Sequence, residues 1–222
     1  MKILALEFSS PRRSVAVLDG QTILAEQAEA AGQTVPPLRL VEQALKAAKV
    51  GRAEIECIAV GLGPGSYNGI RGAIALAQGW QLANGLKLLG ISSVECIAAE
   101  AQAGKVFGSV RVVIDAQRGE LYLANYEICE RTLDETGALR IVTLAEANNA
   151  DDQSSQTVGP EVGRWFPSAR LIFPNAARLG QLAALRNDFV SGERLEPIYL
   201  RATTFVKAPP PRSLESPRKL SG

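Results

Sequence analysis

Hydrophobic positions in the first hundred residues recur with two different periods, and each change of period marks an element. Extended apolar runs that predict strands occupy residues 2–8, 14–20, 22–30, 55–63 and 86–92. Helical periodicity occupies residues 34–51, 68–86 and 93–103. The pair Asp19-Gly20 is typical of a hairpin turn between the second and third strands. The first half therefore predicts a three-stranded meander followed by alternating helices and strands.

The second half repeats this order with weaker signals. Its predicted strands occupy residues 109–117, 119–128, 138–142, 156–160 and 169–173. Its predicted helices occupy residues 143–149 and 176–188, and the polar stretches 130–137 and 148–155 predict surface loops. The order strand–strand–strand–helix–strand–helix thus occurs twice, which indicates a duplicated α/β unit. We expect an N-terminal lobe at residues 1–104, a C-terminal lobe at 105–206 and a disordered, Pro- and Ser-rich tail at 207–222.

Two helices of the first lobe carry more apolar surface than one contact with a sheet requires. Between Gly72 and Gly85 the helix at 68–86 contains no charged residue, and its small residues lie opposite Ile70, Ile74 and Ala77. Small residues allow a second helix to approach closely, so this face predicts a partner interface. The alternative is that these helices pack only on each other and on the third helix. The predicted interface residues are Leu38, Val41, Leu45, Gly72, Ala75, Leu76, Gly79 and Ala83.

Composition narrows the chemistry that the chain could perform. The 222 residues carry a net charge of +1, so no global field favours nucleic acid or an anionic membrane. Histidine is absent, which excludes a Ser-His-Asp triad, a Cys-His pair and imidazole-based metal sites. The three scattered cysteines are typical of reduced, mostly buried thiols. With no secretory signal or membrane-spanning run, these features predict a cytoplasmic protein without a metal centre.

A glycine-rich loop follows the predicted strand at 55–63 and opens the helix at 68–86. It lacks the lysine of a Walker A loop, and Ser66 stands where the dinucleotide fingerprint needs glycine. The Gly-x-Ser-x-Gly pattern of a nucleophile elbow is absent as well. Two interpretations stay open on spacing alone: an anion site at the helix N-terminus, or a tight turn that lets strand and helix pack closely.

The stretch "GLGPGSYNGIRGAIALAQG" (61–79) resembles the motif Gly-x-Gly-Pro-Gly-Ser-Phe/Tyr-Thr-Gly-x-Arg of the TsaB family, also called YeaZ. The opening "ILALEFSS", the segment "IDAQRGELYLANYE" (114–127), "VGPEV" (158–162) and "EPIYLR" (196–201) resemble the same family in the same order. The resemblance covers residues 1–201. It implies an actin-like/sugar kinase/Hsp70 (ASKHA) fold, an α/β fold with two lobes of a duplicated βββαβαβα unit.

The resemblance also implies a role in making N6-threonylcarbamoyladenosine (t6A) at position 37 of tRNAs. Members of the family are paralogues of TsaD, the subunit that performs the transfer, and were formerly described as glycoproteases or inactive metalloproteases. A member would act as a non-catalytic scaffold that binds a TsaD-like catalytic subunit. It would also work with a TsaE-like ATPase, and with tRNA indirectly through the complex.

The chain departs from the family pattern at the end of its first strand. Glu7-Phe8-Ser9 stands where relatives read Asp-Thr-Ser/Ala, and nucleotide-using relatives place a metal-associated carboxylate at that point. One interpretation is the remnant of a degenerate nucleotide site made of Glu7, Ser9, Gly63, Gly65 and Ser66. The alternative is that Glu7 and Ser9 are ordinary polar groups at the end of a strand. In the second half, Asp115, Arg118 and Glu120 predict a polar cluster lining the cleft between the lobes. The alternative is a hairpin with a local Asp115–Arg118 interaction.

Two functions follow from these observations. The first is the non-catalytic scaffold, with no catalytic residues and no cofactor. The second is an active ATP-dependent kinase or ATPase of the actin-like fold, which would need two intact phosphate loops and a metal-holding carboxylate. The sequence leaves open whether a nucleotide sits at the partner interface and whether the free chain forms a homodimer.

Overall fold

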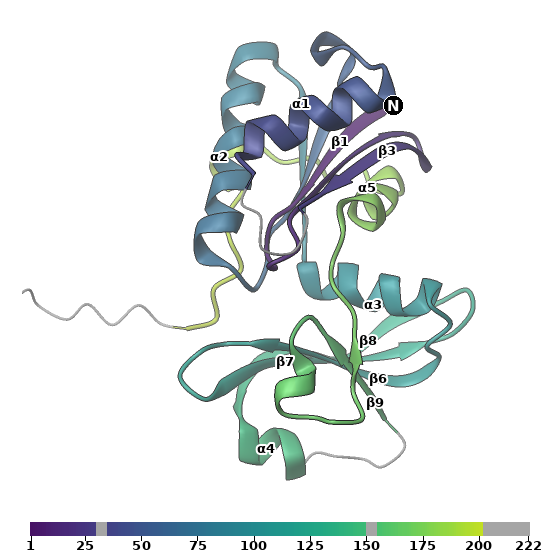
Figure 1. The fold of residues 1–222 in the computed structure, drawn as a ribbon, viewed down its shortest axis with the longest axis vertical. Helices are drawn as coiled ribbons and strands as arrows, with labels where there is room; N and C mark the ends of the chain where they lie inside the picture. The colour runs from purple at the N-terminus through teal and green to yellow at the C-terminus, as the bar shows by residue number, and fades with distance from the viewer. Residues whose placement is uncertain (30–34, 150–154, 202–222) are drawn as a thin grey trace, which may run out of the picture.

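The computed structural model describes residues 1–29, 35–149 and 155–201 and forms two lobes, each built on a five-stranded sheet (Figure 1). The strands of the first sheet lie in the order β3-β2-β1-β4-β5. Its first three strands form an antiparallel meander, whereas β1, β4 and β5 run parallel. These strands are β1 (Lys2–Glu7), β2 (Ser14–Asp19), β3 (Thr22–Ala28), β4 (Cys57–Gly61) and β5 (Lys87–Ile91).

The second sheet repeats this arrangement with the order β10-β9-β6-β7-β8. Again the first three strands in sequence pair antiparallel, and the later two join in parallel. The strands are β6 (Gly108–Asp115), β7 (Glu120–Ile128), β8 (Leu133–Thr143), β9 (Gln156–Gly159) and β10 (Arg170–Leu171). The two-lobed α/β architecture with a repeated strand arrangement, predicted from the sequence, is confirmed.

Helices cover both faces of the first sheet, because its strands alternate apolar side chains on two sides. One face packs against α1 (Pro37–Ala48) and α2 (Tyr67–Asn84) through residues such as Leu4, Val17 and Val60. The other packs against α5 (Ala176–Ala184) through residues such as Ile3 and Leu18. Figure 1 shows α1 and α2 on the side of this sheet opposite α5.

The final helix of each repeat packs on the other repeat's sheet. Helix α3 (Ser93–Ala103) follows β5, yet Val94 and Ile97 lie in the same core cluster as Val110 and Val112 of the second sheet. Helix α5 ends the second repeat but lies against β1 and β2 of the first sheet. These two helices therefore join the lobes in space, and each repeat contributes a helix to the core beside the other repeat's sheet.

The second repeat has a shortened set of helices. Helix α4 (Leu144–Asn149) confirms the short helix predicted there, and the turn η2 (Val162–Arg164) stands in the place that α2 has in the first repeat. The predicted loop at 130–137 is partly wrong, because β8 begins at Leu133 and pairs along β7. The predicted tail at 207–222 lies outside the described residues.

Candidate functional site

The glycine-rich loop between β4 and α2 is shaped by its contact with the end of β1. The amide of Ser66 donates a hydrogen bond to the carbonyl oxygen of Ser9 at 2.7 Å. A Cβ atom on Gly65 would overlap that carbonyl oxygen, and one on Gly69 would overlap the carbonyl oxygen of Phe8. Gly65 also has φ +147°, which side chains disfavour. The glycines thus allow two backbone segments to touch.

Helix α2 begins directly after this contact. The hydroxyl oxygen of Ser66, its N-cap, accepts a hydrogen bond from the amide of Gly69 at 3.3 Å. The amides of Ser66 and Gly69 are therefore bonded within the chain. This geometry favours the tight-turn interpretation of the loop over an anion site.

Glu7, at the end of β1, is fully buried beneath the loop. Its Oε1 accepts a hydrogen bond from the amide of Ser9 at 2.8 Å, and its Oε2 accepts one from the hydroxyl of Ser93 at 2.9 Å. The Ser93 hydroxyl oxygen accepts a bond from the amide of Gly63 at 3.1 Å. A Cβ atom on Gly61 would overlap the Glu7 carboxyl. The carboxyl thus ties β1 to the loop and to the first turn of α3.

Burial raises the pKa of the Glu7 carboxyl, and hydrogen bonds from Ser9 and Ser93 oppose the rise. Because the folded chain then holds this proton more tightly than the unfolded chain, stability falls as pH rises from the ordinary value of 4.5 through the raised folded value. We expect Glu7→Gln to flatten that slope. Urea unfolding of both proteins from about pH 4 to about pH 8 measures it. Equal slopes would contradict the assignment.

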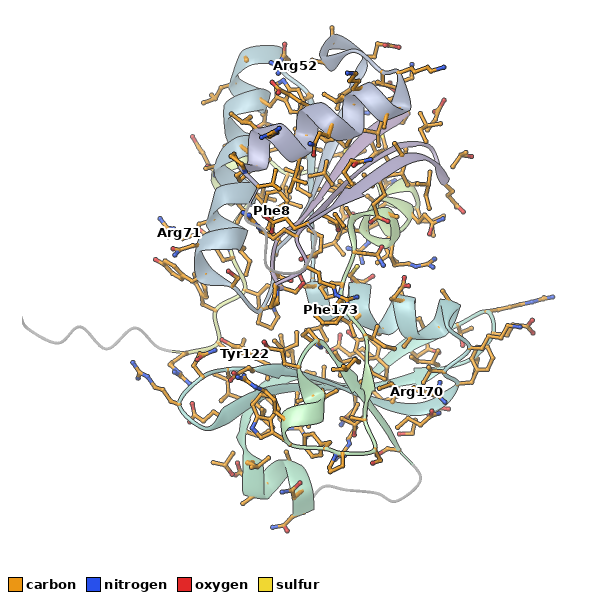
Figure 2. All side chains as sticks on the ribbon, in the orientation of Figure 1. Phe8, Arg52, Arg71, Tyr122, Arg170 and Phe173 are labelled. Carbon is orange, nitrogen blue, oxygen red and sulfur yellow. The ribbon has the colours of Figure 1, made fainter. Side chains whose placement is uncertain are left out.

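A cleft of about 560 Å³ opens between the two lobes. Ser9, Gly65 and Ser66 line it from the first lobe, while Asp115 and Tyr122 line it from the second. Figure 2 shows Tyr122 on the side of the second lobe that faces the first. The structure therefore brings together predicted residues from both halves of the chain. Glu7 and Gly63 do not belong to the cleft lining and lie behind it.

The predicted polar cluster is only partly assembled in this cleft. Asp115 lines it, and its Oδ2 lies 3.5 Å from Nη1 of Arg164. Glu120 forms an ion pair with Arg201 instead, and Arg118 is exposed. The alternative of a local Asp115–Arg118 interaction is wrong, since Arg164 takes that place. Arg118 has φ +59° in a left-handed turn, a feature that the spacing alone did not indicate.

The small-residue face of α2 points away from the core of its lobe. Ile70, Ala73, Ile74 and Ala77 are buried, whereas Ala75, Gly79 and Ala83 are exposed and Gly72 is half-buried. A Cβ atom on Gly72 or Gly79 would meet nothing within 4 Å. This part of the chain is therefore an open helix face.

A groove of about 300 Å³ runs between α2 and α1. Leu38 is 63% exposed at its edge, and Figure 2 shows Arg52 near α1 and α2 at the end of the lobe farthest from the cleft. Val41 is only 2% exposed and forms the floor, while Leu45 lies in the core. The predicted interface is corrected accordingly: Leu45 stabilises the lobe. The groove is lined by Leu38, Val41, Arg52, Ala75, Leu76, Gly79 and Trp80.

The opposite flank of α2 is covered by the last described segment of the chain. The side-chain amide of Gln78 donates to the carbonyl oxygen of Gly192 at 2.7 Å, and the amide of Gly192 donates to Oε1 of Gln81 at 2.7 Å. Further on, Tyr199 stacks on Tyr67 with ring centroids 5.5 Å apart. Of the two flanks of α2, the one facing the groove is therefore open.

The described residues contain no group of three or more Cys, Asp and Glu side chains that could hold a metal ion. Within the same residues, no helix is long and apolar enough to cross a membrane. Cys57 and Cys96 are buried and Cys129 is exposed, and burial raises the pKa of the Cys57 thiol to about 12.

Among the residues that shape these sites, some were missed in the sequence. Trp80 and Arg52 line the groove, and Ser93 binds the Glu7 carboxyl. Trp80 could have been found, because a large aromatic side chain in an otherwise small-residue helix indicates a contact. Ser93 gave no such signal, since its distance from Glu7 along the chain hides their contact.

The structure defines a two-lobed α/β protein. Its glycine-rich loop is hydrogen-bonded to β1 at the cleft, and the groove between α1 and α2 is exposed on the first lobe. The family model described as TsaD, tRNA N6-adenosine threonylcarbamoyltransferase, matches residues 34–194. The tRNA threonylcarbamoyladenosine biosynthesis protein TsaB of Escherichia coli is 27% identical over 95% of this chain and 99% of its own. The Haemophilus influenzae TsaB is 25% identical over 94% of this chain and 98% of its own.

Solved structures agree with this relationship. YeaZ from Pseudomonas aeruginosa has a TM-score of 0.77 at 26% identity, and the match covers 90% of this chain and 99% of that one. A second Pseudomonas aeruginosa structure, described as similar to the peptidase YEAZ, has a TM-score of 0.79 with the same identity and coverage. The chain belongs to the TsaD family, in its TsaB, or YeaZ, branch.

Proposed function

We propose that this chain is a non-catalytic subunit of the tRNA t6A transferase complex and binds a TsaD-like catalytic subunit through α1 and α2. The observation that carries the proposal is the open face of α2, where Gly72 and Gly79 have free space above them beside a groove containing Trp80. Family membership and the similarity to the Escherichia coli protein named for tRNA threonylcarbamoyladenosine biosynthesis support the pathway. In this proposal a TsaE-like ATPase joins the complex, and tRNA is contacted indirectly.

The surroundings of Glu7 support a subunit without its own chemistry. In a nucleotide-using relative the carboxyl at this point would have to face a metal-bound phosphate. Here both Glu7 oxygens accept hydrogen bonds from Ser9 and Ser93 inside the protein. The loop amide of Ser66 is likewise bonded to the backbone of β1. These groups stabilise the lobe and are already engaged.

The cleft between the lobes favours a second candidate, an ATP-dependent kinase or ATPase. Its volume of about 560 Å³ is in the range of small-molecule sites, and Ser9, Ser66 and Tyr67 line it. ATP turnover by the isolated chain with magnesium would distinguish this function from a scaffold.

We expect the isolated chain to bind ATP weakly or not at all. The loop lacks the P-loop lysine, and Glu7 is engaged within the fold. Isothermal titration calorimetry with ATP and magnesium measures the affinity. A low-micromolar dissociation constant, which corresponds to a binding free energy of about −8 kcal/mol, would contradict the expectation and favour the kinase or ATPase.

The direct test of the proposed function is reconstitution. The purified chain is mixed with the TsaD-like protein of its source cell, and complex formation is followed by size-exclusion chromatography. t6A formation on tRNA is then measured with and without the chain. We expect a stable complex and t6A formation that depends on the chain. A chain that neither binds the TsaD-like protein nor changes t6A formation would refute the proposal.

A further inference from the structure

The groove between α1 and α2 presents apolar surface that nothing in the described residues covers. Leu38 at its edge is 63% exposed, and Leu82 on the adjoining face of α2 is 89% exposed. Trp80 is half-buried in the wall, so part of its ring faces the groove. Exposed apolar side chains gathered beside a hollow indicate a binding surface.

The described chain ends at the N-terminal end of α2, on the flank of the helix opposite the groove. Tyr199 stacks on Tyr67, the first residue of α2, and Arg201 donates to the carbonyl oxygen of Ala116 at 3.1 Å. In Figure 1 the yellow end of the described ribbon lies beyond the lower end of α2. Residues 202–222 follow this point in the sequence. A segment that follows Arg201 therefore starts at the N-terminal end of α2.

The remaining chain is long enough to reach the groove. From Tyr67 to Gly79 the helix rises by about 18 Å, at about 1.5 Å per residue, and the crossing to the other flank adds a helix diameter of about 10 Å, which gives a separation of about 21 Å. From Arg201 to Pro209 an extended chain spans up to about 26 Å, at about 3.3 Å per residue. The route crosses the outer face of α2, where Gly72, Ala75 and Gly79 leave open space. Small residues thus lie where a crossing segment needs them.

The chemistry of the segment matches the groove. "KAPPPR" at 207–212 contains three consecutive prolines, Pro209, Pro210 and Pro211. Consecutive prolines favour the polyproline II conformation, which loses little entropy on binding. Aromatic-lined grooves recognise such segments by packing on the proline rings. Trp80 and the aliphatic Leu38 and Leu76 supply a groove wall of that kind.

We propose that Pro209–Pro211 binds the α1–α2 groove of its own chain and competes there with the partner subunit. Because the segment is tethered, its effective concentration at the groove is in the millimolar range, so a weak intrinsic affinity is enough for partial occupancy. The competition rests on the proposed function, whereas the binding of the segment to the groove does not.

The two tryptophans allow both statements to be tested separately in the full chain. Trp80 lies in the groove and Trp165 in the second lobe, so fluorinated tryptophan gives one signal from each. Signals are assigned with Trp165→Phe. The variant Pro209→Ser/Pro210→Ser/Pro211→Ser is compared with the control Pro217→Ser, which changes a proline further along the same tail. We expect the triple variant to shift the Trp80 signal by more than its linewidth while Trp165 and the control stay unchanged.

Four other outcomes would overturn the binding of the segment. These are no shift at Trp80, an equal shift at both tryptophans, the same shift in Pro217→Ser, and a Trp80 signal that changes on dilution. The last of these would mean that a second copy covers the groove.

Competition is tested by titrating the TsaD-like protein into both forms. The triple variant should bind about 2-fold to 10-fold more tightly than the unchanged chain. Equal affinities would refute the competition. Absence of any binding would refute the proposed function instead, with the fluorine signals still reporting on the segment.

Discussion

Replacing Gly79 by arginine should abolish assembly with the catalytic subunit and leave the fold intact. Gly79 has nothing within 4 Å of a Cβ atom and lies on the outer face of α2. Arginine is a better helix former than glycine, so the melting temperature should not fall. In the proposed complex the same side chain would bury an unpaired charge and force the helices apart. Affinity for the TsaD-like protein should fall on the order of 100-fold or more.

The matched control for this experiment is Gly163→Arg. Gly163 lies in η2 of the second lobe, and a Cβ atom there also meets nothing within 4 Å. The Gly163→Arg variant carries the same added charge on a different surface, so we expect it to assemble normally. Thermal melting and size-exclusion chromatography are run on both variants. A well-folded Gly79→Arg chain that still assembles would remove α2 from the interface, and an unfolded one would mean that the face packs inside the chain.

Much of the fold follows from the period of the hydrophobic pattern. Helix α3 occupies residues 93–103 as expected, because its apolar positions and the preceding Ser92 N-cap agree. β8 begins earlier than expected, since its first half is polar on exposed positions and gains its strand geometry from pairing with β7. Such pairing depends on a neighbouring strand, and the local sequence of 133–137 does not contain that information.

The candidate sites were predictable to the extent that they depend on one element. The face of α2 could be predicted from helical spacing, because Gly72, Ala75 and Gly79 recur on one side. The burial of Leu45 could not, since an apolar position on a helix looks the same whether a sheet or a partner covers it. The Glu7–Ser93 contact joins residues far apart in sequence, and only the tertiary fold brings them together.

The exchange of α3 and α5 between the lobes has a consequence for the cleft. Each helix follows one sheet in sequence and packs on the other, and Nε of Arg178 on α5 lies 3.2 Å from Oε2 of Glu100 on α3. The lobes are therefore joined by packed helices as well as by the chain. A partner that binds α1 and α2 contacts the lobe against which α5 packs. Through the contact of α5 with α3, that lobe is joined to the second lobe on the other side of the cleft.

Substituting Gly65 by alanine should destabilise the first lobe more than any change on the α2 face. The new Cβ atom would overlap the carbonyl oxygen of Ser9, and φ +147° is unfavourable for alanine. Backbone strain and overpacking together should cost about 3 kcal/mol, which lowers the melting temperature by roughly 6–12 °C. The matched change Gly72→Ala, in open space on α2, should instead stabilise by about 0.5–1 kcal/mol. If the loop were an adaptable ligand-binding loop rather than a packed turn, the Gly65→Ala variant would melt within a degree or two of the unchanged chain. Calorimetric melting of the three proteins decides between these outcomes.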